Sequence, residues 1–144
     1  MRINGEWSLC DDRIVRPVLR GEIQAADDSW ESAEFLVDTG ADRTVLSAAT
    51  VAALRLQPLG TLDRLAGLGG VVHSVLVETQ VRLIREDGGQ VVFRGRYSAV
   101  TELEALDMSV LGRDITGLFA VIVDRPGNIV CLLGGEHQYT IEQK

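Results

Sequence analysis

The segment of residues 35–46 constrains the fold of this 144-residue chain more than any other. Its leading apolar residues, Phe35, Leu36 and Val37, run directly into Asp38. An apolar run of this kind predicts a buried strand that carries a carboxylate to its own end. Because burial of an ionised acid costs free energy unless the acid is paired or functional, Asp38 is a candidate functional residue.

The two residues after Asp38 suit a tight loop. Gly40 gives the backbone the freedom for a sharp turn and lets another chain approach closely. Thr39 adds one hydroxyl that can donate and accept a hydrogen bond. Asp-Thr-Gly could equally end a strand as an ordinary Asp/Gly turn, so this triplet alone leaves a catalytic and a purely structural interpretation open.

Composition indicates one globular domain and argues against two classes of partner. A chain of this length can bury about two thirds of the surface that its unfolded form exposes. With 46% hydrophobic and 24% charged residues the chain is not disordered as a whole, and fifteen glycines against three prolines suit a turn-rich β protein. A net charge of -7 with scattered arginines disfavours nucleic acid and anionic membrane surfaces as partners.

Signals for secretion, disulfides and metal binding are weak in this chain. Residues 1–20 contain charges throughout and lack an apolar core of signal-peptide length, and no run could span a bilayer, so we expect a cytoplasmic protein. Cys10 and Cys131 are too far apart to indicate a disulfide framework and lack metal-ligand spacing, so we expect free thiols. The acidic pairs at 11–12 and 27–28 are interpreted as solvated loop residues.

The rest of the chain predicts hairpins and one short helix. Expected strands are residues 18–24, 33–37, 61–66, 71–85, 91–100, 119–124 and 129–133. The last two strands join through a Pro126-Gly127 turn of expected type II. Ser47 is the expected N-cap of a helix over residues 48–56.

Three glycines, Gly67, Gly69 and Gly70, surround Leu68 between two extended segments. Such a run could indicate a phosphate-binding loop, but the Walker and Rossmann loops lead from a strand into a helix and have a different spacing. Extended segments on both sides predict a hairpin instead. Its tip has the small side chains and free backbone groups that a mobile flap over an extended peptide needs.

Three motifs together resemble the retropepsins, the single-domain aspartic peptidases of retroviral type. The string Asp-Thr-Gly-Ala-Asp-x-Thr-Val-Leu at 38–46 resembles their active-site segment, and residues 67–70 resemble their flap tip. Apolar residues before Gly112, Arg113 and Asp114 resemble their Gly-Arg-Asn/Asp signature, which implies a short helix that begins there and stops at Gly117. Two departures are Ala66, where viral flaps often have glycine, and the hairpin after the third motif, which resembles the longer cellular and bacterial members, where such strands help form the dimer interface.

The resemblance implies a mostly β, retropepsin-like closed barrel with a flap hairpin and one or two short helices. The domain is expected at 18–133, between an N-terminal extension, 1–17, that Trp7 and Leu9 could pin to it, and a C-terminal tail, 134–144. The implied function is an aspartic endopeptidase that cleaves extended polypeptides with an activated water and needs neither a metal nor an organic cofactor. Because the chain has one Asp-Thr-Gly, the catalytic pair of carboxylates requires a symmetric homodimer.

The resemblance also implies roles for single residues. Asp38 would be the catalytic acid and base, Thr39 would hydrogen-bond across the dimer axis, and Gly40 would accept a hydrogen bond from the substrate backbone. Asp42 would contact the substrate further along and form an ion pair with Arg113, which would brace the loop. The residues expected to line substrate subsites or to bind the substrate from the flap are Ala41, Val45, Gly67, Leu68, Gly69, Met108 and Val110.

Other functions stay open at this stage. A catalytically silent module could keep this fold for dimerisation or peptide binding, because a fold does not guarantee an activity. In an unrelated β-rich binding protein Asp38 would be merely a turn residue. A serine hydrolase is disfavoured, since His73 and Ser74 lack a third partner and an oxyanion motif, and we expect His73 on the outer face of a strand.

Overall fold

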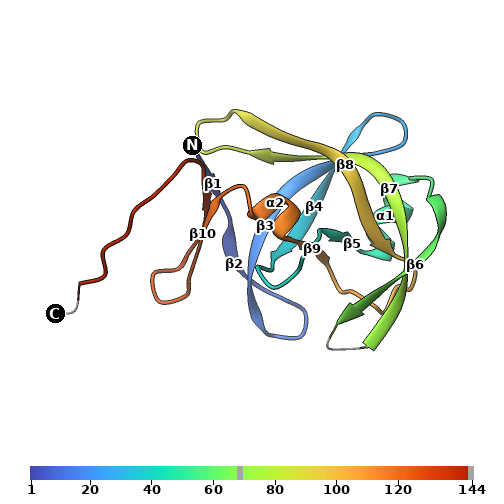
Figure 1. Cartoon of the computed structure of the whole chain (residues 1–144), viewed down its shortest axis with the longest axis horizontal. Coiled ribbons are helices and arrows are strands. Elements are labelled where there is room, and N and C mark those ends of the chain that lie inside the picture. The colour runs from blue at the N-terminus through green and yellow to red at the C-terminus, as the bar shows by residue number, and fades with distance from the viewer. Residues whose placement is uncertain (68–69, 143–144) are drawn as a thin grey trace.

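The chain is mostly β, with two sheets and two short helices (Figure 1). A computed structural model describes residues 1–67 and 70–142, and for residues 61–67 the backbone alone. Its strands are β1 (Arg2–Asn4), β2 (Glu6–Leu9), β3 (Val15–Gln24), β4 (Trp30–Val37), β5 (Val45–Leu46), β6 (Leu59–Gly67), β7 (Gly70–Ile84), β8 (Gln90–Val100), β9 (Ser109–Leu111), β10 (Ala120–Asp124) and β11 (Ile129–Leu133). Its helices are α1 (Ala48–Leu54) and α2 (Arg113–Thr116). The expected fold class is confirmed.

The larger sheet has eight strands in the order β2-β3-β4-β9-β5-β8-β7-β6. A further pairing of β3 with β7, at Glu22↔Arg82 and Ile23↔Val81, joins its two halves into a ring. The smaller sheet has the order β1-β11-β10. Within the described residues, no helix is long and apolar enough to cross a membrane.

Strands β3 and β4 form the hairpin that leads to Asp38. They pair antiparallel from Val18↔Leu36 to Gln24↔Trp30, across a turn in which the Asp27 side chain accepts hydrogen bonds from the backbone N–H and the hydroxyl of Ser29. β4 begins three residues earlier than expected, because β3 continues its pairing up to Trp30. The end of β4 is buried at Phe35 and Val37, as the apolar run predicts.

The N-terminal residues form strands of both sheets. β1 pairs with β11, and β2 pairs with β3 from Glu6↔Val18 to Leu9↔Val15. The Trp7 indole N–H donates to the Asp124 carbonyl oxygen at 3.0 Å. The Trp7 side chain also packs against the core. The segment expected as an extension, 1–17, therefore contributes strands and a core contact to the domain.

Local signals place both helices. Ser47 caps α1, where its hydroxyl accepts from the Thr50 backbone N–H at 3.2 Å. The helix ends two residues earlier than expected, because Arg55 adopts a left-handed conformation with φ 57°. α2 begins at Arg113 and Gly117 follows its end, both as expected.

The turn between β10 and β11 differs from the expected type II turn. A type II turn would need a positive φ at Gly127, but the residue with positive φ there is Asn128, at 58°. The Asp124 carboxylate accepts from the Gly127 backbone N–H at 2.9 Å, and the Asn128 N–H donates to the Arg125 carbonyl at 3.1 Å. The conformation of this four-residue loop is therefore set by the Asp124 side chain and by its last residue, the left-handed Asn128.

Three further expectations are confirmed. Cys10 and Cys131 are free thiols, the second buried in β11. His73 is exposed on β7, and β6 and β7 form the expected hairpin, pairing antiparallel up to Gly67↔Gly70. Its tip residues Leu68 and Gly69 lie outside the described residues.

Replacement of Phe35 by alanine should strongly destabilise the fold. Phe35 is fully buried in the core where β4 approaches Asp38, so Phe35→Ala should lower the free energy of unfolding by about 3–5 kcal/mol. The control Val92→Ala, at a β8 residue that is 45% exposed, should change it by less than about 1 kcal/mol. Denaturant titration followed by circular dichroism measures both. Equal effects of the two changes would contradict the assignment of the core.

Candidate active site

Asp38 stands at the end of β4, in a loop that holds its carboxylate. The Asp38 backbone N–H donates to the Leu111 carbonyl at 3.2 Å, so β4 stays attached to β9 at the point where the loop begins. One Asp38 carboxylate oxygen accepts from the Gly40 backbone N–H at 2.9 Å. The Ala41 N–H closes the loop onto the Asp38 carbonyl at 3.2 Å. Asp38 itself is half-buried, and Thr39 and Gly40 are exposed.

The strands around this loop bring the third sequence motif to the first. β9 runs parallel to β4, from Phe35↔Ser109 to Val37↔Leu111. Two parallel neighbours end at the same edge of the sheet, so residues that follow β9 meet residues that follow β4. The beginning of α2 therefore lies against the Asp38 loop, although about 70 residues separate them in sequence.

Gly112, just before α2, lies in close contact with the backbone of the Asp38 loop. A Cβ atom at this position would lie 2.2 Å from the Arg43 carbonyl carbon and 2.7 Å from the Thr44 nitrogen, so no larger residue fits without a backbone shift. The next residue, Arg113, donates its backbone N–H to the Ala41 carbonyl at 2.8 Å. Glycine here is required by contact with the backbone of the Asp38 loop.

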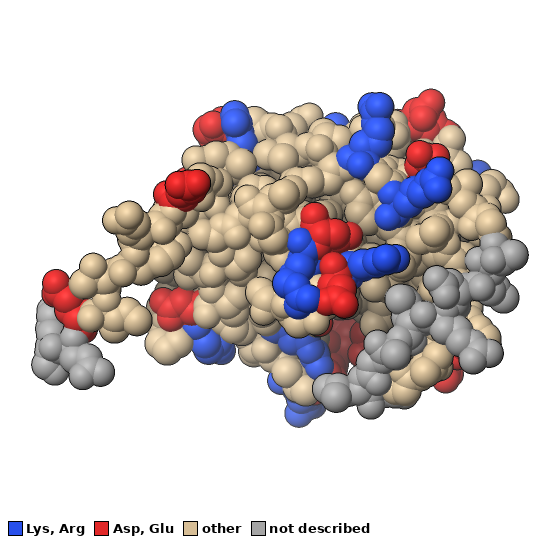
Figure 2. Space-filling view, viewed as in Figure 1, with Lys and Arg blue, Asp and Glu red and all other residues tan. Residues whose placement is uncertain are grey.

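Arg113 braces the loop with its side chain. One guanidinium N–H donates to the Thr39 carbonyl at 2.8 Å, and the other terminal nitrogen forms an ion pair with the Asp42 carboxylate. The ion pair expected between these residues is present. Figure 2 shows acidic and basic side chains side by side over α2. Both partners are more than half exposed, so the pair adds little stability and acts chiefly by fixing the path of the loop.

A second brace was missed by the sequence analysis. The Asp114 carboxylate accepts from the Thr44 backbone N–H at 2.9 Å and from its hydroxyl at 2.7 Å. The Thr44 hydroxyl in turn accepts from the Gly112 N–H at 3.1 Å, and Thr44 is fully buried. The available signal was the acid that completes the Gly-Arg-Asp triplet, together with a threonine inside the active-site motif.

The expected subsite residues are distributed around the loop. Ala41, Val45 and Met108 are half-buried, and Val110 is 9% exposed. Val45 of β5 is the direct cross-strand partner of Val110 of β9. These four residues belong to the segments that flank Asp38. Gly67 ends β6, and the expected flap residues Leu68 and Gly69 lie outside the described part of the chain.

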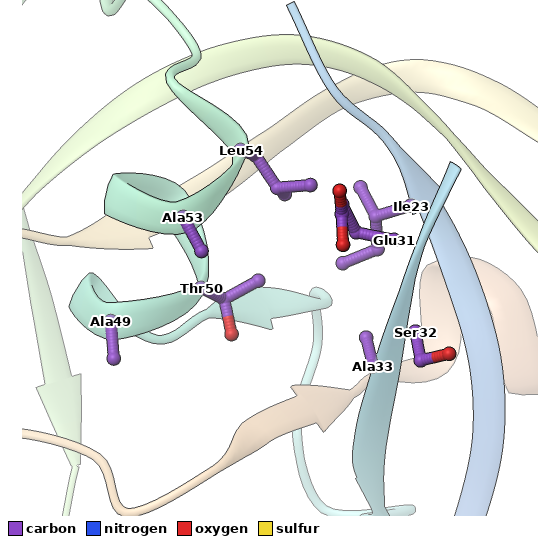
Figure 3. A pocket seen from close by; sticks show the side chains of 8 residues that line it. All are labelled: Ile23, Glu31, Ser32, Ala33, Ala49, Thr50, Ala53 and Leu54. Atoms are coloured by element: carbon purple, nitrogen blue, oxygen red, sulfur yellow. The ribbon is translucent and has the colours of Figure 1, made fainter. Parts of the chain in front are cut away.

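Two pockets of the chain lie away from Asp38. One, of about 260 Å³, is lined by Ile23, Glu31, Ser32, Ala33, Ala49, Thr50, Ala53 and Leu54 (Figure 3). It borders the first half of β4, at the opposite end from Asp38, between that strand and α1. The other, of about 290 Å³, lies at the end of α2 against the tail. Neither is lined by Asp38, whose neighbours Thr39 and Gly40 are open to solvent.

Two carboxylates belong to this loop, Asp38 and Asp42, and Asp42 is paired with Arg113. No group of three or more histidine, cysteine or acidic residues in the described part of the chain is arranged to hold a metal ion. A single carboxylate can accept or donate a proton, but peptide hydrolysis needs a base for the water and an acid for the leaving nitrogen.

Comparisons with known proteins agree with this geometry. A family model described as aspartyl protease matches residues 26–115, which include the Asp38 loop and the Gly-Arg-Asp triplet. The chain is similar to the protease of EIAV complexed with the inhibitor HBY-793, with 25% identity, a TM-score of 0.51, and coverage of 71% of this chain and 86% of that one. No curated protein matches the chain.

A second solved structure resembles this chain over a longer stretch. It is a retropepsin-like aspartic protease from Rickettsia conorii, with 16% identity and a TM-score of 0.53. The match covers 92% of this chain and 88% of that one. At this identity the likeness concerns the fold alone, which is the retropepsin-like fold that the sequence motifs predict.

The buried Thr44 hydroxyl should matter more than a second buried threonine close by. Thr44→Val would leave the Gly112 N–H without its hydroxyl acceptor, and we expect a loss of about 1–3 kcal/mol in the free energy of unfolding. Thr116 only donates to the Gly112 carbonyl, which also accepts backbone N–H groups, so Thr116→Val should cost less than about 1 kcal/mol. Denaturant titration of both variants measures the difference. A larger loss for Thr116→Val would contradict this account of the junction.

Proposed function

We propose that this chain is an aspartic endopeptidase active as a symmetric homodimer. The chain belongs to the aspartyl protease family and has the retropepsin-like fold. The observation that carries the proposal is the Asp38 loop. Its carboxylate is oriented by the Gly40 N–H, and the loop is braced to α2 through Arg113. A carboxylate held this firmly at a strand end and still reachable from solvent suits acid–base catalysis better than a turn residue would.

The second carboxylate comes from a second copy of the chain. Two carboxylates about 3 Å apart cannot both ionise, so they share one proton and their apparent pKa values separate, as is known for aspartic proteases. With one Asp-Thr-Gly per chain, the two copies of Asp38 meet only across a two-fold axis. Thr39, exposed beside that axis and held at its carbonyl by Arg113, would hydrogen-bond to the partner loop.

The dyad would hydrolyse a peptide bond in two steps, the addition of water and the collapse of the resulting intermediate. The ionised Asp38 takes a proton from a water molecule, whose oxygen attacks the scissile carbonyl carbon, while the protonated Asp38 of the partner subunit gives its proton to the carbonyl oxygen. Collapse of the tetrahedral intermediate then breaks the C–N bond: the leaving nitrogen takes the proton held by Asp38, and one hydroxyl of the intermediate returns its proton to Asp38 of the partner subunit. Water is the nucleophile, and the dyad returns to its starting state of one shared proton.

The substrate would be an extended polypeptide. The exposed Gly40 would accept a backbone hydrogen bond from it, and Asp42, held by Arg113, would contact it further along. Main-chain bonds of this kind bind an extended segment, and alternate side chains enter pockets on either side. The residues proposed to line those pockets or to close over the substrate from the β6–β7 hairpin are Ala41, Val45, Gly67, Leu68, Gly69, Met108 and Val110.

Replacement of Asp38 by asparagine should abolish proteolysis and leave the fold intact. Asparagine has the shape of aspartate but cannot act as acid or base, so the rate should fall by about 10²–10⁴-fold or more. The matched control is Asp27→Asn, in the turn between β3 and β4, which should keep activity within about twofold. The measurement is cleavage of an unfolded protein substrate from mildly acidic to neutral pH, with and without a statine-type transition-state mimic.

Two outcomes would overturn this proposal. Undiminished cleavage by Asp38→Asn would assign the chemistry to another residue. A wild-type protein that forms folded dimers and yet cleaves nothing at any pH would favour a catalytically silent module for dimerisation or peptide binding.

A further inference from the structure

The pocket of about 260 Å³ between β4 and α1 plays no part in the proposed function. Its floor is apolar, because Ile23 and Leu54 are buried there. Its walls include three alanines, Ala33 of β4 and Ala49 and Ala53 of α1. Since an alanine side chain ends at Cβ, the space between strand and helix stays unfilled. A larger side chain at these positions would close the pocket.

The helix that forms one wall of the pocket is fixed at both ends. At its last turn, the Leu54 carbonyl accepts from the Ala26 backbone N–H at 3.0 Å. At its beginning, the Ser47 N–H donates to the Ser109 hydroxyl at 3.0 Å, and the Ser47 and Thr50 hydroxyls lie 2.8 Å apart. The pocket therefore exists before any ligand binds, and little conformational entropy is lost when one enters.

The core-facing side of β4 changes from apolar to acidic at this pocket. Side chains of a strand alternate between its faces, so Glu31 shares a face with Ala33, Phe35 and Val37. Phe35 and Val37 are buried, whereas Glu31 is exposed. Figure 3 shows the Glu31 side chain reaching from β4 toward α1. In the described part of the chain, no basic side chain lines the pocket and no ion pair involves Glu31.

The cation that follows α1, Arg55, acts on a different acid. The pKa of Asp27 is lowered by hydrogen bonds from the Ser29 hydroxyl and backbone N–H and, to a smaller extent, by the charge of Arg55. The chain as a whole has a net charge of -7. A negatively charged surface attracts cationic partners. Charge thus favours a cation as the group that meets Glu31.

The backbone of β4 has an unpaired edge beside the pocket. β4 pairs with β3 along most of its length, but with β9 only at residues 35–37. The Asp38 N–H donates to β9. Because backbone groups alternate between the two sides of a strand, the N–H and C=O of Ser32 point to this same side, beyond the start of β9. Ser32 lines the pocket, and an extended polypeptide can pair with an edge of this kind.

We propose that this pocket binds a lysine side chain of an extended polypeptide. The polypeptide backbone would pair with Ser32, and a side chain level with Ala33 would point to the same face as Ala33 and enter the pocket. The methylene groups of the lysine would pack on the apolar floor, and its ammonium would meet the Glu31 carboxylate. This site lies at the opposite end of β4 from Asp38, and the proposal does not depend on the proposed function.

The test is a titration of the full chain carrying Asp38→Asn, which prevents cleavage, with the blocked peptide acetyl-Thr-Thr-Lys-Thr-Thr-amide. Amide chemical shifts of the isotope-labelled protein locate the bound peptide and give its dissociation constant. A second peptide with norleucine in place of lysine keeps a four-carbon side chain and removes the charge. We expect shifts at Ser32, Ala33 and Ala53, and a dissociation constant about two- to fivefold higher for the norleucine peptide, as for one exposed ion pair.

Three variants in this background locate the contacts. Ala53→Leu should raise the dissociation constant of the lysine peptide by roughly tenfold or more, because leucine fills the space for the lysine stem. The matched control Ala52→Leu adds the same side chain at the next residue, which is exposed and does not line the pocket, and should change the constant by less than about twofold. Glu31→Gln should weaken only the lysine peptide, so that both peptides bind alike.

The outcomes separate this inference from the proposed function. Absence of shifts at the pocket with about 10 mM peptide, or equal effects of Ala53→Leu and Ala52→Leu, would overturn the site. Equal binding of both peptides to the chain with Glu31 would overturn the choice of lysine, and equally tight binding of n-butylamine would indicate a site for small amines instead. Shifts confined to the Asp38 loop would contradict this site and support the proposed function. A wild-type chain without Asp38-dependent cleavage would contradict only the proposed function.

Discussion

The structure depends on the contact between the Asp38 loop and the beginning of α2. Gly112 allows two backbone segments to touch where no side chain would fit, and Arg113 and Asp114 on either side of the loop then hold its path. Without this junction the loop would depend on the hydrogen bonds that Asp38 makes with Gly40, Ala41 and Leu111. The parallel pairing of β4 and β9 brings these two motifs together.

The contacts at this junction have two effects: the buried contacts stabilise the fold, and the exposed contacts fix the position of the loop. Thr44 and Gly112 are buried, so the hydrogen bond between them is costly to break and anchors the loop to the core. The Arg113–Asp42 pair is exposed and contributes little to the stability of the fold. Because the Arg113 guanidinium contacts both the Asp42 carboxylate and the Thr39 carbonyl, it fixes the loop on the solvent side. A catalytic carboxylate needs both kinds of support, because a small displacement of the reacting group costs much of the rate.

Sequence reasoning worked where the signal was local. The apolar run before Asp38, the Ser47 cap and the glycine after α2 each act within a few residues, and each predicted its element. The Arg113–Asp42 pair followed from the family resemblance rather than from spacing. Asp114 and Thr44 were missed because their role depends on the parallel pairing of β4 and β9, which no local pattern encodes.

The N-terminal segment shows the same limit. Residues 2–9 read as polar with isolated apolar positions, yet they become β1 and β2 because β11 and β3 offer them edges to pair with. The prediction of a type II turn at Pro126-Gly127 was wrong for a related reason. The Asp124 carboxylate and the left-handed Asn128 override the preference of a Pro-Gly pair for that turn type. Edges and side-chain caps from neighbouring residues decide such segments, and they become visible only in three dimensions.

The central claim is that each active site takes one Asp38 from each of two chains. The most direct measurement is a mixing titration, in which Asp38→Asn chains are added to wild-type chains under conditions of subunit exchange and the cleavage rate is followed. If the dyad spans two chains, an equal mixture at fixed total concentration should retain about one quarter of the wild-type activity, because only that fraction of dimers carries two intact acids. Retention of about one half would mean that each chain works alone and would contradict the account.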